Sequence, residues 1–335
     1  MKDVYILAIE SSCDETSVAI IKNGKEDLAT VISTQIDIHK NFGGVVPEIA
    51  SRKHIENITM VLEEALTKVK MTMDDITAIA VTVGPGLIGS LLVGVEAAKT
   101  LGFLYQKPVI PVQHITGHIY ANAINNDLKF PLLTLVVSGG HTELIYMKDH
   151  LSFEKIGGTL DDAVGEAYDK VSRALGFGYP GGPIIDQMAA SGEVSYPLPL
   201  PMNDDSYQFS FSGIKSAVMN LIHNEKQRGN EIRKEDMAAT FQDRVVTILV
   251  KKTLHAAKEY QVKNVLLSGG VAANKGLRLA LKDTLEQNGI DLSVPDFKYC
   301  TDNASMIGAA GYFYYQLNKM DTYPLAAKAN LEIQS

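Results

Sequence analysis

The same pattern of strand, polar turn and strand occurs twice in this sequence, and that repetition constrains the fold more than any other feature. An apolar stretch at residues 5–9 is followed by a polar turn at residues 10–16 and a second apolar stretch at residues 17–21. The pattern returns at residues 132–147, where the turn begins with Ser138. A repeat spaced so far apart predicts two related domains rather than a solenoid of short repeats.

Helices are predicted between the apolar strands. Further strands are predicted at residues 78–83 and 265–267, and each leads into a glycine-containing turn. Apolar or small-residue spacing predicts helices at residues 47–69, 87–104, 161–175, 237–260 and 275–287. Strands that alternate with helices indicate the α/β class.

The composition is that of an ordinary globular protein. The chain has 335 residues, of which 46% are hydrophobic and 21% charged, and this length suits about two domains. Its two cysteines cannot form a disulfide framework and indicate a reducing compartment. No stretch approaches the ~18–20 unbroken apolar residues of a membrane span, and the N-terminus lacks a secretion signal. We therefore expect a cytoplasmic protein without a membrane contact.

The net charge of −8 limits how the chain can contact nucleic acid. A protein that binds nucleic acid tightly by itself usually carries a basic excess. If nucleic acid is a substrate, we expect the contact to cover a small patch or to need the help of a partner.

Two histidines four residues apart, His114 and His118, predict a metal site. At this spacing on a helix both imidazoles lie on one face, within reach of one ion. Ile115 stands where the metalloprotease motif carries its general base, Glu, and this argues against a peptidase. Asp302 precedes a helix of small residues, where it is either the N-cap or a third ligand. Two histidines and a carboxylate suit Fe(II) or Zn(II), although the spacing alone also permits two ordinary buried histidines.

The turn Ser138-Gly139-Gly140-His141 predicts a phosphate site. Its two glycines let backbone amides approach a ligand closely, and the serine and histidine add donors. The turn at Ser11-Ser12 is its counterpart in the first half of the chain. The alternative is that both are plain hairpin turns.

A GxGxxG motif at residues 84–89 does not predict a dinucleotide site, because no acidic residue ends the following strand. What remains is close packing of a helix on a strand, or a generic anion site at the helix N-terminus near Gly86. Of these two, packing is favoured.

Three polar residues near glycine-rich loops are candidates for nucleoside contacts. Asn274 follows Gly269-Gly270, from which its carboxamide can reach a flat ring. Asp169 and Asp186 bracket a Pro–Gly loop at residues 179–183, a position from which a carboxylate can accept from ribose hydroxyls. Each of them alone is also typical of an ordinary surface residue.

Together these motifs resemble the tRNA adenosine threonylcarbamoyltransferase family over nearly the whole chain. The histidine of the turn at 138–141 and the run Asp14-Glu15-Thr16 resemble the bacterial branch. The segments that carry the resemblance are residues 9–16, 39–54, 84–89, 114–118, 138–143, 161–170, 179–183, 209–215 and 268–274.

The resemblance implies an architecture. Members of the family are built from two duplicated RNase-H-like units of the actin, sugar-kinase and Hsp70 type, with a nucleotide cleft between the domains. We expect the first domain at residues 1–112 plus 304–335 and the second, with a helical insertion, at residues 113–303.

The resemblance also implies an activity, metal-assisted acyl transfer. The threonylcarbamoyl group of L-threonylcarbamoyl-adenylate passes to N6 of the adenosine beside the anticodon in tRNAs reading ANN codons, and AMP is released. The implied metal ligands are His114, His118 and Asp302, with one Fe(II) ion as the usual assignment. The implied contacts to the phosphate and acyl part are Val137, Ser138, Gly139, Gly140 and His141. The implied nucleoside contacts are Asp169, Gly182, Asp186 and Asn274.

The resemblance further implies partners: a paralogous dimerisation partner, a small ATPase and a separate synthase that makes the adenylate. Three other functions compete with this one. A metallopeptidase would need a base at Ile115, and a sugar kinase or ATPase of the same fold would have no use for a histidine pair. A non-catalytic scaffold would not need His114, His118 and Asp302 together.

Overall fold

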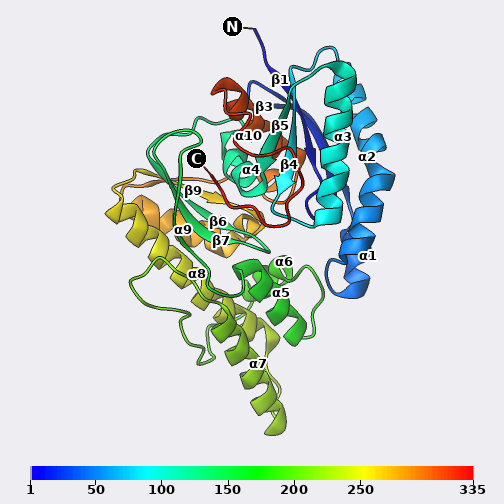
Figure 1. Ribbon diagram of the computed structural model, residues 1–335. Coiled ribbons are helices and arrows are strands. Elements are labelled where there is room, and N and C mark those ends of the chain that lie inside the picture. Colours follow the sequence, from blue (N-terminus) through cyan, green and yellow to red (C-terminus); the bar gives the residue numbers. More distant parts are fainter. Residues whose placement is uncertain (1, 335) are drawn as a thin grey trace. The chain divides into compact units, whose positions relative to one another are not determined.

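The chain folds into two compact units (Figure 1). The computed structural model describes residues 2–334. The first, unit 1, consists of the described part of Met1–Leu128, Asp149–Phe153 and the described part of Pro295–Ser335. The second, unit 2, consists of Lys129–Lys148 and Glu154–Val294.

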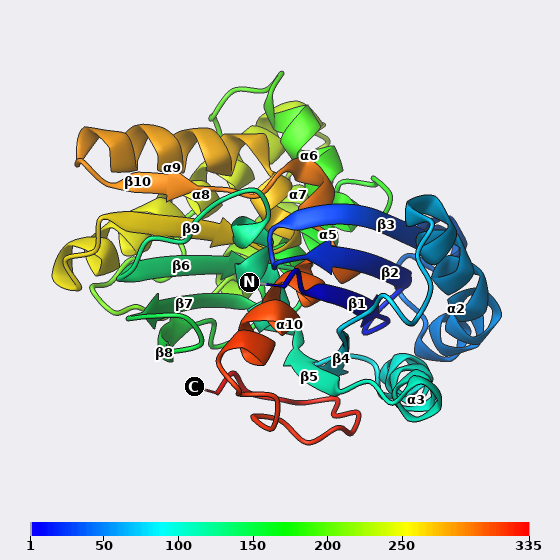
Figure 2. The same cartoon turned by 90° about the horizontal axis from the view of Figure 1, so that it is seen from above.

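Unit 1 contains a five-stranded mixed sheet. Its strands are β1 (Tyr5–Glu10), β2 (Glu15–Lys22), β3 (Glu26–Thr34), β4 (Ala78–Gly84) and β5 (Val109–Gln113). Their order is β3-β2-β1-β4-β5, as Figure 2 shows. β1 pairs with β2 antiparallel, with Leu7 opposite Ile20, and with β4 parallel, with Leu7 opposite Ile79. The strands of the first predicted repeat are therefore confirmed as neighbours in one sheet.

Helices cover both faces of the unit 1 sheet (Figure 1). The helical segments are α1 (Ile36–His39), η1 (Lys40–Phe42), α2 (Pro47–Val69), α3 (Ile88–Tyr105), α4 (His114–Tyr120), η2 (Ala121–Ala123), η4 (Phe297–Tyr299) and α10 (Ala304–Gln316). A Cβ added at Gly308 of α10 would meet Ala8, whereas one added at Gly94 of α3 would meet Ile9. Because successive side chains of a strand point to opposite faces, α10 and α3 lie on opposite sides of β1.

Unit 2 repeats the same topology. Its strands are β6 (Leu132–Val137), β7 (Thr142–Met147), β8 (Phe153–Gly158), β9 (Asn264–Ser268) and β10 (Asp291–Ser293), and only the first residue of β8 falls in unit 1. The order β10-β9-β6-β7-β8 is that of unit 1 when each set of strands is counted along the chain (Figure 2). β6 pairs antiparallel with β7 and parallel with β9, as β1 does with β2 and β4. The predicted duplication of an RNase-H-like α/β unit is confirmed.

Most helices of unit 2 are inserted between β8 and β9. The helical segments of the unit are α5 (Val164–Ala174), α6 (Gly181–Ala189), α7 (Ser212–Gln227), α8 (Lys234–Glu259), η3 (Gly270–Ala273) and α9 (Lys275–Gln287). α8 packs on α6 and α9, and α5 packs on α6 and α7. Residues 179–183, expected to be a connecting loop, instead run into α6, which begins at Gly181.

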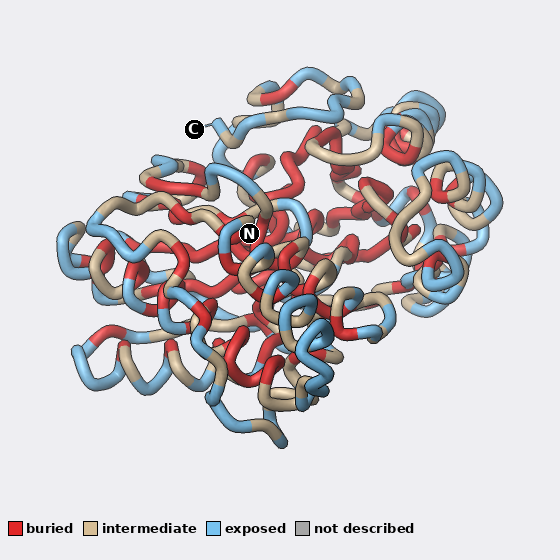
Figure 3. The backbone as a smooth tube through the Cα atoms, turned by 90° about the horizontal axis from the view of Figure 1, so that it is seen from below, coloured by how far each residue is buried: buried red, intermediate tan, exposed pale blue. Residues whose placement is uncertain are grey.

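Each sheet forms the core of its own unit, as the buried segments in Figure 3 indicate. Every residue of β4 and of β6 is buried. Strands covered on both faces read as continuous apolar runs, which is how both were recognised in the sequence. Complete burial of one Val, Leu or Ile side chain contributes about 1.5–3 kcal/mol to folding.

The unit boundaries differ from the predicted domain boundaries at three places. Residues 113–128, 149–153 and 295–303 belong to unit 1, whereas the sequence assigns them to the second domain. The physical reason is packing, because α4, which follows residue 113, packs on α10.

α3 is the one described helix that is long and apolar enough to cross a membrane. A third of its residues, 33%, are buried in unit 1, where the helix packs on α2 and β4. The sequence did not predict a membrane span, and one helix that passes this test by length and composition is weak evidence for one.

Candidate functional site

The histidine pair lies on α4, which begins directly after β5. The side chain of Gln113 caps this helix by accepting a hydrogen bond from the Thr116 amide at 2.8 Å. All seven residues of α4 are buried. The turn from β5 into α4 therefore fixes His114 and His118 on one face of a helix that cannot move without disturbing the core of unit 1.

Asp302 joins the two histidines from the loop before α10. The N-cap of α10 is Asn303, whose side chain accepts from the Met306 amide at 3.0 Å. The alternative interpretation of Asp302 as the cap is therefore wrong. Its Oδ1 lies 3.4 Å from Nε2 of His114 and 3.2 Å from Nε2 of His118, and one ligand atom from each residue lies within 4.8 Å of the others.

Burial and mutual electrostatic interactions shift the pKa values of all three residues of the cluster. Burial disfavours a charge on Asp302, but His114 and His118 outweigh it and hold the pKa of the carboxyl well below its usual range. Burial also disfavours charge on His114, yet Asp302 and Glu10 together hold the pKa of that imidazole well above its usual value. The pKa of His118 is lowered, chiefly by burial.

The cluster fits a divalent transition metal. Both ring nitrogens of the buried His118 lack a hydrogen-bond partner among the described residues, although Nε2 lies close to Asp302. Burying a polar atom without a hydrogen-bond partner costs free energy. A metal ion would coordinate the lone pair of one of these ring nitrogens. Two imidazoles and one carboxylate with remaining open positions are the donor set of Zn(II) and non-haem Fe(II) sites.

The predicted phosphate turn lies in unit 2 and is open. The turn follows Val137, and it is closed by hydrogen bonds from the Ser138 amide to the His141 carbonyl (2.8 Å) and from the His141 amide to Ser138 Oγ (3.1 Å). The amides of Gly139 and Gly140 donate no hydrogen bond within the described part of the chain, and a Cβ there would meet no atom within 4 Å. Two free backbone donors beside open space can bind an anion.

The counterpart turn in unit 1 is packed rather than open. The Ser12 amide donates to Glu10 and the Ser12 carbonyl accepts from Leu87. A Cβ at Gly86 would lie 2.6 Å from the Ser12 carbonyl oxygen. The glycine motif at residues 84–89 is thus explained by close packing, the interpretation that the sequence favoured.

The predicted nucleoside residues lie in unit 2. Asp186 of α6 accepts from the side chain of Gln242 at 3.0 Å and from the Lys275 amide at 3.1 Å. Asn274 caps α9 and donates to Gln242 Oε1 at 2.8 Å. Gln242 therefore joins Asp186 to Asn274, and nothing in the sequence marked it beyond its being a polar residue on the buried side of α8.

Asp169 lies on α5 and contacts the start of α6, where Gly182 is the second residue. Asp169 accepts from the Gly181 amide at 2.7 Å, and burial raises the pKa of its carboxyl. A Cβ at Gly182 would meet no atom within 4 Å. The structure thus collects the nucleoside candidates around α6, and the metal-ligand candidates in unit 1.

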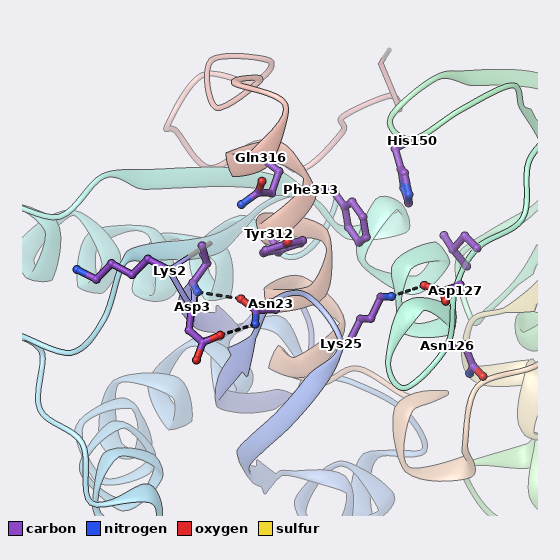
Figure 4. A pocket seen from close by; sticks show the side chains of 12 residues that line it. Lys2, Asp3, Asn23, Lys25, Asn126, Asp127, His150, Tyr312, Phe313 and Gln316 are labelled. Carbon is purple, nitrogen blue, oxygen red and sulfur yellow. Dashed lines mark hydrogen bonds and ion pairs between the residues drawn. The ribbon is translucent and has the colours of Figure 1, made fainter.

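A separate cavity of about 440 Å³ lies in unit 1 and includes none of the predicted site residues. Figure 4 shows that Lys25 and Asp127, which line it, form an ion pair. His150 stacks on Phe313 at its wall, with ring centroids 4.0 Å apart.

Solved structures share this fold. The chain resembles full-length HypF in its phosphate- and nucleotide-bound form, with a TM-score of 0.61 and 17% identity over 97% of this chain and 47% of HypF, so it spans about half of that protein. It also resembles component A of the Acidaminococcus fermentans (R)-2-hydroxyglutaryl-CoA dehydratase, with a TM-score of 0.54 and 17% identity over 95% of this chain and 99% of the other. These similarities define the class, a two-unit protein of the actin-like α/β fold.

Sequence similarity identifies the family within that class. The TsaD family model, described as tRNA N6-adenosine threonylcarbamoyltransferase, matches residues 26–309. A tRNA N6-adenosine threonylcarbamoyltransferase of Bacillus subtilis (strain 168) is 58% identical over 100% of this chain and 97% of its own length. The enzyme of the same name from Staphylococcus aureus (strain JH9) is 56% identical over 99% of this chain and 98% of its own length. The chain belongs to the tRNA N6-adenosine threonylcarbamoyltransferase family, and it is an acyltransferase.

Proposed function

We propose that this chain transfers the threonylcarbamoyl group of L-threonylcarbamoyl-adenylate to N6 of the adenosine beside the anticodon in tRNAs reading ANN codons. The observation that carries the proposal is the cluster of two buried imidazoles and a half-buried carboxylate in a chain of this family. In the reaction the N6 nitrogen bonds to the carbamoyl carbonyl carbon, the bond from that carbon to the phosphate oxygen breaks, and AMP leaves. The proton lost from N6 balances the charge of the departing phosphate.

His114, His118 and Asp302 are proposed to hold one Fe(II) ion, with Zn(II) as the alternative that the same donor set permits. When bound, such an ion polarises an oxygen of the acyl donor as a Lewis acid. The residues themselves provide the position, because α4, which carries both histidines, packs on α10, which begins two residues after Asp302.

The turn after Val137 is proposed to bind the phosphate and acyl part of the donor. The amides of Gly139 and Gly140 donate no hydrogen bond within the described residues, and they can donate to oxygens that gain charge as AMP leaves. Ser138 and His141 close the turn, and their mutual hydrogen bonds keep these amides in place before substrate arrives. Most of the rate enhancement is then positioning and electrostatic stabilisation.

Asp169, Gly182, Asp186 and Asn274 are proposed to bind the nucleoside of the adenylate. Carboxylates suit ribose hydroxyls, and a carboxamide suits a base edge. The absence of a side chain at Gly182 leaves room for the ligand beside Asp169.

A protein partner is part of the proposal. α3 exposes Phe103, Leu104 and Leu92, with exposed fractions of 78%, 64% and 46%. Large apolar side chains on one helix are typical of a surface that another protein covers. We assign this surface to the paralogous dimerisation partner, with a small ATPase completing the complex in the cytoplasm.

The rival functions meet specific obstacles in the structure. Ile115, at the position of the peptidase base, is 1% exposed and packed in the core of unit 1. A sugar kinase of the same fold has no use for a cluster in which His118 nitrogens remain unpartnered. Neither rival accounts for the match to a transferase family over most of the chain.

The decisive experiment is a transfer assay. The protein, its two partners, unmodified tRNA and threonylcarbamoyl-adenylate labelled in the threonine are mixed, and label is counted on the tRNA. We expect label that is lost in His118→Ala and in protein stripped of metal. Metal-dependent cleavage of a glycoprotein, or ATP turnover driven by a sugar without tRNA, in place of transfer would overturn the proposal.

A further inference from the structure

Glu10, the last residue of β1, is a buried carboxylate to which the sequence assigned no role. Its exposed fraction is 0%. Three donors surround it within unit 1: the Ser12 amide at 2.6 Å from Oε1, Thr82 Oγ1 at 2.7 Å from Oε2, and Nδ1 of His114 at 3.2 Å from Oε2. A carboxylate that is only an acceptor satisfies all three at once.

The position of Glu10 decides which nitrogen of His114 is free. Facing a carboxylate, Nδ1 must carry a hydrogen, and Ser12 Oγ, 3.2 Å from the same nitrogen, does not replace that acceptor. With the hydrogen on Nδ1, the lone pair of the neutral ring lies on Nε2. Nε2 is the nitrogen that faces Asp302, at 3.4 Å.

We propose that Glu10 is the positioning residue of the metal site, because it holds His114 in the tautomer and ring orientation that direct the Nε2 lone pair towards Asp302 and the ion. The inference rests on the proposed function of His114 as a metal ligand. Carboxylates that accept from the second nitrogen of a ligating histidine fix its orientation in this way, and their loss typically weakens metal binding about 10- to 100-fold.

The donor pattern makes Glu10→Gln a sharp test. A glutamine has one acceptor oxygen and an amide that donates, so it cannot accept from Ser12, Thr82 and His114 together. If its oxygen stays with the Ser12 amide, its NH₂ group faces Nδ1. The imidazole then accepts at Nδ1 and carries its hydrogen on Nε2, which removes the lone pair from the nitrogen that faces Asp302.

The experiment measures zinc binding to the full chain without tRNA or partners, by competition with a chelator. We expect Glu10→Gln to weaken zinc binding about 10- to 100-fold, and Glu10→Asp, which keeps the acceptor, to recover part of the loss. Glu143→Gln is the matched control, because it removes one charge from a strand of unit 2, where the carboxylate pairs with Lys155. It should bind zinc as the wild type does.

A second measurement does not depend on the variant folding. In zinc-loaded wild-type protein with isotope-labelled histidine, magnetic resonance distinguishes a ring that carries hydrogen on Nδ1 from one that carries it on Nε2. We expect hydrogen on Nδ1 of His114. The resonance of this ring is assigned as the one that disappears in His114→Gln. Hydrogen on Nε2, or equal zinc affinity of Glu10→Gln and wild type, would overturn the role of Glu10 while leaving the metal site intact. A wild type that binds no zinc and no Fe(II) would instead overturn the proposed metal site itself.

Discussion

Substitution of Gly165 by alanine tests how α5 supports the phosphate turn. Gly165 is the second residue of α5, and its amide donates to the Ser138 carbonyl at 3.1 Å. A Cβ at this position would lie 2.6 Å from the Ser138 oxygen and 2.9 Å from the Cα and amide nitrogen of Gly139. These are backbone atoms, which cannot turn aside as a flexible side chain can, so either α5 or the turn must shift.

Two opposing effects determine how far Gly165→Ala changes the free energy of unfolding. Replacing glycine by alanine inside a helix stabilises it by at most ~1 kcal/mol, whereas overpacking in a tight contact costs about 1–3 kcal/mol. We therefore expect Gly165→Ala to lower the free energy of unfolding by about 1–2 kcal/mol. Gly213, the second residue of α7, is the matched control, because a Cβ there would meet no atom within 4 Å. Gly213→Ala should leave stability unchanged or raise it by up to ~1 kcal/mol.

Urea unfolding of both variants gives the stability difference, provided that the slope of the transition stays equal to that of the wild type. The transfer assay adds a functional reading, in which Gly165→Ala raises the KM for the adenylate because the amides of Gly139 and Gly140 are displaced. The reasoning is refuted if the two alanine variants have the same stability and the same KM.

Three further predictions concern the metal cluster and unit 2. Zinc at about 100 times its Kd should stabilise the wild type by ~2.7 kcal/mol, and a thermal shift assay should find no such gain in His118→Ala. The raised pKa of His114 stabilises the metal-free protein below the imidazole's unfolded pKa, and this contribution is lost as the pH rises through the higher folded pKa. Urea unfolding from about pH 6 upwards should therefore show a loss of stability with rising pH that is smaller in the zinc-loaded form. In unit 2, the hydrogen bond from Lys252 holds the pKa of Asp204 at about 2, so Lys252→Met should return that pKa, followed by magnetic resonance, towards its ordinary value of about 3.9.

The elements of each sheet were predictable because the information is local. β6 and α9 match their predicted ranges closely, since an apolar run covered on both faces and an amphipathic period are both visible in a single segment. The spacing of His114 and His118 likewise predicts a shared helix face, and the structure places them there. Short strands such as β10 were missed because three residues carry no period.

The groups that support the site were not predictable, because they depend on contacts between distant segments. Glu10 and Thr82 stand near the ends of apolar strands, and only the parallel pairing of β1 with β4 brings them together. Gln242 joins Asp186 and Asn274 across three helices, which no local pattern records. The role of Asp302 remained ambiguous in the sequence because its neighbour Asn303 is an equally good N-cap, and the structure shows that Asn303 caps the helix.

The duplicated topology places Glu10 and Val137 at equivalent positions, each the last residue of the central strand of its sheet. In unit 1 this position carries the carboxylate of Glu10, and its surroundings can accommodate a positive charge. In the other copy it is apolar and followed by two backbone amides that donate no hydrogen bond within residues 2–334, so the same corner suits a negative charge. One strand-and-turn scaffold thus provides surroundings of opposite polarity, and the difference lies in the residue that ends the strand and in the turn after it rather than in the order of the strands.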